Sequence, residues 1–126
     1  MSDDELAGLA GPIGLRQGEK VPNQLRILAA QENLGTLRSV HRPNSWLGRI
    51  SVRGRFFVFD QGIVLENGDG AHLMLFPVGA MGISETDGIF LVGGPQGRVK
   101  YVTKRWSDGE VLAKTLTGWA PTHPWQ

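Results

Sequence analysis

The residues from Arg55 to Pro77, RFFVFDQGIVLENGDGAHLMLFP, decide the fold of this chain. This stretch contains three short apolar runs separated by turn-forming residues, and the runs are Phe56–Phe59, Ile63–Leu65 and Leu73–Phe76. Short runs of Phe, Val, Ile and Leu between Gly, Asn and Asp are typical of strands joined by tight turns. Asn67-Gly68-Asp69-Gly70 is the strongest turn signal, because these residues tolerate the positive φ of a two-residue hairpin. The stretch predicts an antiparallel β-meander whose alternate residues face the core, with Phe57 or Phe59 buried.

The composition is that of one soluble domain. The chain has 126 residues, of which 40% are hydrophobic and 20% are charged, and its formal net charge is +1. This length supports an independent core, and the small net charge argues against a dedicated nucleic-acid-binding protein. The absence of cysteine excludes disulfides, thiolate metal sites and a cysteine nucleophile. It also fits a cytoplasmic location, as does an acidic amino terminus unlike a secretory signal. No apolar run approaches the roughly 20 residues of a transmembrane segment.

Local patterns predict the elements on either side of the meander. We expect residues 1–20 to form a flexible arm and residues 21–126 to form one domain. Apolar residues at helical spacing predict a helix over Asn23–Asn33 that ends at Gly35. A strand is expected to begin at Leu37, and further strands are expected over Trp46–Val52, Met81–Glu85, Gly88–Val92 and Val99–Trp106. The turn Thr86-Asp87-Gly88 is expected to link Met81–Glu85 to Gly88–Val92.

The carboxyl-terminal part of the chain changes from strand to helix periodicity. Ser107 and Glu110 have the S-x-x-E spacing of a capping box, in which the serine hydroxyl accepts a backbone N–H and the glutamate reaches back to the serine amide. Apolar residues at helical spacing follow, and they predict a helix over Asp108–Thr117 that ends at Gly118. We expect Trp119 to dock this helix onto the sheets.

This order of elements resembles that of pleckstrin-homology-like (PH-like) domains, in which two bent antiparallel sheets are closed at one corner by a C-terminal helix. The run Arg55-Phe-Phe-Val-Phe-Asp-Gln-Gly-Ile-Val is similar to the R-x-x-V-F-x-Q-G-[IL]-V segment of uncharacterised bacterial PH-like proteins. The run Leu28-Ala-Ala-Gln-Glu-Asn-Leu-Gly resembles the helix that precedes their first strand. The resemblance implies a mainly β fold, a small PH-like barrel of two sheets capped by the C-terminal helix, with an extra N-terminal helix. It assigns no catalytic residue.

Positive charges gather in two windows of the sequence that contain no acid. The first window lies between Glu32 and Asp60, and the second contains Arg98, Lys100, Lys104 and Arg105. The cations that we expect to share one basic face are Arg49, Arg53, Arg55, Lys100 and Lys104. Arginine recognises phosphate and carboxylate groups in bidentate geometry, so this face is a candidate site for an anionic lipid or another anionic ligand. The alternative is that the charges protect strand edges from edge-to-edge pairing. They would then be solvated, or each arginine would pair across strands with Glu66, Glu85 or Asp87.

The sequence contains no recognisable set of catalytic or metal-binding residues. His41, His72 and His123 lie far apart without the spacing of metal ligands, and no nucleophile elbow or phosphate loop is present. We therefore expect no enzyme activity, no metal and no cofactor. A small enzyme, or a small-molecule sensor that uses the barrel mouth, stays the alternative.

Trp125, in the tail Thr122–Gln126, is a candidate anchor for a partner, because tryptophan is enriched at interface hot spots. The alternative is that the tail folds back and buries this side chain. Short strands with open edges suit the addition of a strand from a partner or the assembly of copies. The sequence therefore predicts a PH-like binding or assembly module whose partner is a protein or a second copy of the chain.

Overall fold

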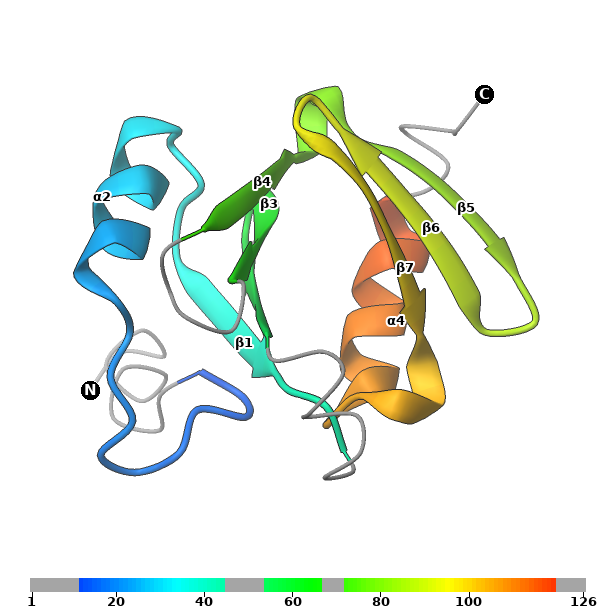
Figure 1. The fold of residues 1–126 in the computed structure, drawn as a ribbon, viewed down its shortest axis with the longest axis horizontal. Coiled ribbons are helices and arrows are strands. Elements are labelled where there is room, and N and C mark those ends of the chain that lie inside the picture. The colour runs from blue at the N-terminus through cyan, green and yellow to red at the C-terminus, as the bar shows by residue number, and fades with distance from the viewer. Residues whose placement is uncertain (1–11, 45–53, 67–71, 120–126) are drawn as a thin grey trace, which may run out of the picture.

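The computed structural model describes residues 12–44, 54–66 and 72–119. These residues form two antiparallel sheets, two α-helices and two short 3₁₀ helices, so the predicted mainly β class is confirmed (Figure 1). The first sheet has the order β1-β2-β3-β4, and its strands are Leu37–His41, Arg55–Phe59, Gly62–Glu66 and Leu73–Pro77. The second sheet has the order β5-β6-β7, and its strands are Gly82–Thr86, Ile89–Gly94 and Gly97–Val102. The helices are α2 (Asn23–Gln31), η1 (Val78–Ala80), η2 (Thr103–Arg105) and α4 (Gly109–Trp119).

The predicted meander is confirmed as strands β2, β3 and β4. Phe57 pairs with Val64 across β2 and β3, and Val64 pairs with Leu75 across β3 and β4. The Asp60-Gln61 turn joins β2 to β3, as its sequence predicts. The predicted Asn67–Gly70 turn lies outside the described residues.

Both faces of the first sheet are buried, which corrects the expectation that only alternate residues of the meander face a core. All four residues of Phe56–Phe59 are buried. The predicted burial of Phe57 or Phe59 is confirmed, since they are 0% and 5% exposed. Phe57 and Phe59 pack with Leu25 of α2 in one cluster, and Phe56 and Val58 belong to another. The reason is that α2 covers the face of the sheet opposite the second sheet and α4 (Figure 1).

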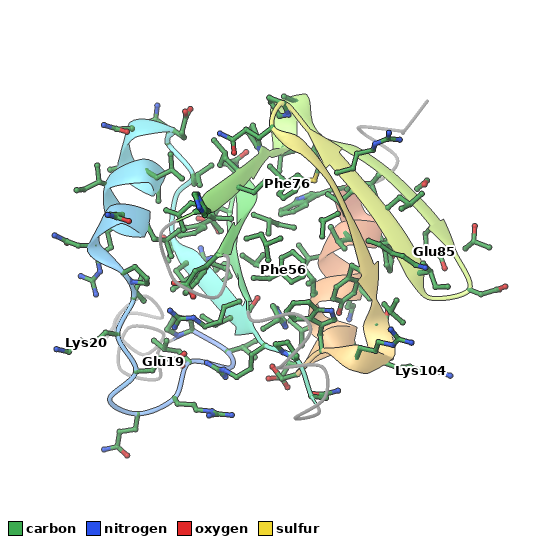
Figure 2. The ribbon with its side chains drawn as sticks, in the orientation of Figure 1. Glu19, Lys20, Phe56, Phe76, Glu85 and Lys104 are labelled. Carbon is green, nitrogen blue, oxygen red and sulfur yellow. The ribbon has the colours of Figure 1, made fainter. Side chains whose placement is uncertain are left out.

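The larger core lies between the two sheets and α4. Phe56 and Phe76 point into this space from the first sheet (Figure 2). The Phe56 ring lies 4.5 Å from the Trp106 ring and 5.9 Å from the Tyr101 ring, measured between centroids. Trp119 packs against the same cluster, as predicted. Because each large apolar side chain contributes about 1.5–3 kcal/mol when it is buried, this cluster holds the sheets and α4 together.

The start of the C-terminal helix differs from the prediction. Helix α4 starts at Gly109 rather than Asp108 and ends at Trp119 rather than Thr117, so Gly118 lies inside it. The Ser107 hydroxyl accepts the N–H of Arg42 at 3.0 Å, and the Ser107 N–H donates to the Arg42 carbonyl at 2.7 Å. These two hydrogen bonds join the residue before α4 to the residue after β1. The Ser107 hydroxyl bonds to the Arg42 backbone, which would otherwise lack a partner for its N–H.

Other predicted boundaries also move. Strands β5 and β6 replace the predicted Met81–Glu85 and Gly88–Val92 with shifts of one or two residues. Helix α2 ends at Gln31 rather than Asn33, because Asn33 adopts a positive φ of 53°. The last predicted strand, Val99–Trp106, stops at Val102, where η2 begins. The predicted strand Trp46–Val52 lies outside the described residues.

Part of the predicted N-terminal arm lies along the edge of β1. The Ile13 N–H donates to the Arg38 carbonyl at 3.0 Å, and the Val40 N–H donates to the Ile13 carbonyl at 2.8 Å. Ile13 thus forms a short parallel bridge with β1. Ile13 therefore pairs with backbone groups that the edge of β1 would otherwise leave unpaired. Residues 1–11 lie outside the described part of the chain.

Candidate binding cleft and ion-pair network

A cleft of about 480 Å³ lies between α4 and the β5–β6 hairpin. The hairpin, the end of β7, η2 and α4 all contribute to its lining. Its apolar side chains include Phe90 and Ala113, and its charged side chains are Glu85, Asp87, Lys104 and Glu110. Figure 2 labels Glu85 near the hairpin end and Lys104 below α4. This volume falls within the range typical of ligand pockets.

The hairpin turn that borders the cleft is fixed by its own residues and by η2. Asp87 and Gly88 have φ values of 53° and 79°, which is the type I′ geometry that the Asp-Gly dipeptide favours. The Glu85 carboxylate accepts the Gly88 N–H at 2.9 Å. The Thr103 hydroxyl donates to the Gly88 carbonyl at 2.8 Å. Both the N–H and the carbonyl of Gly88 are therefore hydrogen-bonded, which fixes the turn.

Helix α4 presents a second face to the cleft. Glu110, Ala113 and Thr117 follow each other at helical spacing and all line the cleft. Leu112 and Leu116 lie on the other side of the helix, buried in the larger core. One helix thus closes the core and forms one wall of the cleft.

The charge and the strand edge at the cleft both favour an added chain segment. The cleft lining contains three carboxylate side chains, Glu85, Asp87 and Glu110, and one ammonium side chain, Lys104. Among the described strands, β5 pairs only with β6. An edge strand of this kind can pair its backbone with a segment from another chain.

The described residues among those predicted to form a basic face lie in three different surroundings. Arg49, Arg53 and Trp125 lie outside the described residues. Lys100 is exposed on β7 opposite Leu91. Lys104 lines the cleft together with three acids. Arg55, at the start of β2 in the first sheet, lies between two glutamates.

Arg55 belongs to an ion-pair network in which negative and positive side chains alternate, in the order Glu66, Arg55, Glu19 and Arg42. Its guanidinium donates to both oxygens of Glu66, at 2.7 and 2.8 Å, and to Glu19 at 2.8 Å. Arg42 donates to the other oxygen of Glu19. The hydrogen bond to Glu66 and then that to Glu19 raise the pKa of Arg55 against the effect of burial. Burial disfavours the ionised form of Glu19, but backbone and guanidinium hydrogen bonds outweigh it and lower the pKa of this carboxyl.

His41 is a second polar centre, and it is enclosed. Its Nδ1 lies 2.8 Å from the Ser107 carbonyl, and its Nε2 lies 2.8 Å from the Ser39 hydroxyl. A carbonyl only accepts, so Nδ1 carries the proton and Nε2 accepts from Ser39 in the neutral ring. Burial lowers the pKa of His41. Ser39 and His41 resemble a nucleophile and its base, but they are 2% and 0% exposed, so the pair is closed to a substrate.

Of the two glutamates that pair with Arg55, Glu66 was a possible cross-strand partner on sequence grounds, whereas Glu19 was not foreseen. The acid-free windows were defined along the chain, whereas Glu66 and Glu19 reach Arg55 through the fold. The meander contained a signal for Glu66, because a two-residue turn at Asp60-Gln61 places position 66 opposite position 55. No local pattern indicated Glu19, which lies 36 residues away from Arg55 in the sequence.

The described residues provide no group of three or more His, Asp or Glu side chains that could hold a metal ion. Within the same residues, no helix is long and apolar enough to cross a membrane. Comparisons of the chain with protein-family models, with curated proteins and with solved structures found no match. The function is therefore inferred from the cleft and the ion-pair network themselves.

Proposed function

We propose that this protein is a binding module that holds an extended segment of a protein partner in the cleft between α4 and the β5–β6 hairpin. The observation that carries the proposal is the position of the cleft, with Phe90 and Ala113 in its lining, at a sheet whose strand β5 pairs only with β6 among the described strands. A partner segment added to β5 gains backbone hydrogen bonds. Its alternate side chains then point toward the cleft, since successive residues of a strand face opposite sides.

The charges around the cleft define the chemistry of this partner. Glu85, Asp87 and Glu110 outnumber Lys104, so a segment that carries Lys or Arg beside apolar residues complements the site. Opposite charge increases the rate of association and the discrimination against wrong partners more than it increases affinity. The partner we propose is therefore a basic segment with alternating apolar residues.

We infer as well that the fold is PH-like, with the two sheets forming a small barrel that α4 caps. The resemblance implies two antiparallel sheets of six or seven short strands followed by a terminal helix, and the described strands form two antiparallel sheets followed by α4. A binding role fits this reading better than catalysis, because the hydroxyl of Thr103 in the cleft is engaged by Gly88 and the Ser39–His41 pair is buried.

The proposal is tested with a dye-labelled peptide of alternating Lys and Val, followed by fluorescence anisotropy. We expect saturable binding that weakens as salt screens the charges. The double variant Glu110→Lys with Asp87→Asn should weaken binding by about tenfold or more. Asn is chosen at position 87 because it tolerates the positive φ of the turn. Glu85 is left intact because its carboxylate holds Gly88.

Glu32→Lys is the matched control, because this exposed residue adjoins α2 and is not part of the cleft lining. The control should bind the peptide as the wild-type protein does. Equal binding by the wild-type protein and the double variant would contradict the proposal. Equal binding of a peptide of alternating Glu and Val would contradict the proposed partner chemistry.

A further inference from the structure

Arg42 and Arg55 direct their guanidinium groups at the same carboxylate. Arg42 directly follows β1 and Arg55 begins β2, and these strands pair with His41 opposite Phe56. Arg42 donates to Oε1 of Glu19, and Arg55 donates to Oε2 of Glu19 at 2.8 Å. The side chains of Arg42, Arg55 and Glu19 are only 13%, 22% and 16% exposed. Two arginines that share the oxygens of one anion form a geometry suited to carboxylate and phosphate recognition.

Each arginine is also held by a second acceptor. Arg42 donates to the Gly14 carbonyl at 2.8 Å. Arg55 is bound by both oxygens of Glu66, and its guanidinium carbon lies 4.8 Å from the centroid of the Phe57 ring. Glu66 balances the charge of one of the two arginines, so one positive charge is left for another anion. When Glu19 is removed, the guanidinium groups of Arg42 and Arg55 therefore keep their orientation and together carry one positive charge that no carboxylate balances.

Glu19 comes from a turn rather than from a sheet or a helix. Its N–H donates to the Arg16 carbonyl at 3.0 Å, and its carboxylate accepts the Arg16 N–H at 2.9 Å. Figure 2 shows Glu19 and its neighbour Lys20 on this irregular segment beside the first sheet. Glu19 can therefore leave the two arginines without breaking any strand pairing, whereas the arginines are fixed by β1 and β2.

We propose that Arg42 and Arg55 form a binding site for a carboxylate or phosphate group of a ligand, and that Glu19 fills this site until the ligand displaces it. None of these three residues lines the cleft, so the proposal does not depend on the proposed function. An intramolecular competitor has an effective concentration that is typically millimolar. The wild-type protein should therefore take up a simple anion weakly, and removal of Glu19 should open the site.

The test follows the thermal unfolding of the Glu19→Ala variant in inorganic phosphate, in acetate and in sodium chloride at equal ionic strength. We expect phosphate or acetate to raise the melting temperature saturably. The half-maximal concentration should be about tenfold or more lower for Glu19→Ala than for the wild-type protein. Phosphate acting at the lower concentration assigns the site to a phosphate group, and acetate doing so assigns it to a carboxylate.

Two further variants make the result specific. Adding Arg42→Gln to Glu19→Ala should abolish the anion effect, and Glu32→Ala should respond as the wild-type protein does. The proposal is overturned if Glu19→Ala responds to phosphate and acetate no more than Glu32→Ala, or if the loss of Arg42 changes nothing. If Glu19→Ala does not fold, Glu19→Gln takes its place with NMR detection of the arginine Nε–H groups. Phosphate should shift the signals of Arg42 and Arg55, and unchanged signals would overturn the site.

Discussion

His41 links two distant parts of the chain through one buried ring. It accepts from Ser39 on its own strand and donates to the carbonyl of Ser107, which precedes α4. The sequence marked His41 only as an isolated histidine, since nothing near it indicates a partner 66 residues away. Its neutral form is the one that the fold accommodates, because protonation would make Nε2 a second donor in a buried site.

The free energy of unfolding should therefore fall as the pH falls through about 6.5. Burial lowers the pKa of His41 in the folded protein, although nearby Asp108 opposes this and Arg42 adds to it. The unfolded chain then binds more protons than the folded one, at a cost of at most about 1.4 kcal/mol per pH unit. Urea unfolding between about pH 5 and about pH 7 measures this slope.

The control for this slope is the loss of an exposed histidine. His41→Gln should flatten the pH dependence even if the variant is less stable throughout. His72→Gln removes an exposed histidine directly before β4 and should keep the wild-type slope. An unchanged slope in His41→Gln would show that another group controls the pH dependence.

Gly109 is the residue that lets α4 approach η2. A Cβ at this position would overlap the Thr103 carbonyl and lie 2.9 Å from the Tyr101 hydroxyl, whose O–H donates to the Gly109 carbonyl at 2.6 Å. We expect Gly109→Ala to lower the free energy of unfolding by about 1–3 kcal/mol. Gly118→Ala in the same helix meets no atom within 4 Å and should instead add about 0.5–1 kcal/mol. Equal effects in urea unfolding would contradict this account of the helix.

At the scale of elements, the first sheet has two buried faces because it lies between two layers. Short apolar runs between turn residues predicted the strands of the meander but not this double burial, since runs such as Phe56–Phe59 fit one or two buried faces equally well. The covering element was itself predictable, because α2 has apolar residues at helical spacing. Its contact with Phe57 and Phe59 depends on the tertiary arrangement and has no local signal.

Helix α2 should therefore contribute strongly to stability through its inward face. Leu25 is 0% exposed, whereas Ile27 is 53% exposed on the same helix. Leu25→Ala should lower the free energy of unfolding by about 2–5 kcal/mol, because it opens a cavity above the sheet. Ile27→Ala should change it by less than about 0.5 kcal/mol. Chemical denaturation of both variants measures these changes. Similar losses of unfolding free energy in the two variants would show instead that α2 is only loosely attached to the sheet.

The sequence predicts an element boundary best where the backbone conformation of a turn requires particular residue types. The Asp87-Gly88 turn occurs where Asp-Gly predicts it, because few dipeptides accept two consecutive positive φ angles. The capping box at Ser107 had an equally clear signal, yet the hydroxyl of Ser107 bonds to Arg42. A side chain that can cap a helix can also satisfy a neighbouring strand, and only the fold decides between these partners.

At the scale of the whole molecule, both candidate sites arise where distant segments meet. The cleft combines a hairpin, a 3₁₀ helix and one face of α4, and the network combines an N-terminal turn with two strands. Charge counting along the sequence therefore located the cations but not their partners. Arg55 was expected on a basic face and is found between two glutamates. Of the cleft acids, Glu110 was singled out only as part of the predicted capping box, and no motif indicated the cleft itself.

The most direct test of the cleft is a residue-resolved NMR titration with the peptide of alternating Lys and Val. We expect shifts at the backbone amides of Glu85, Asp87, Glu110 and Ala113, and slower hydrogen exchange along β5 as its edge becomes paired. We expect no comparable change along α2. Shifts confined to other surfaces, or none at about millimolar peptide, would contradict the claim that this cleft binds an extended basic segment.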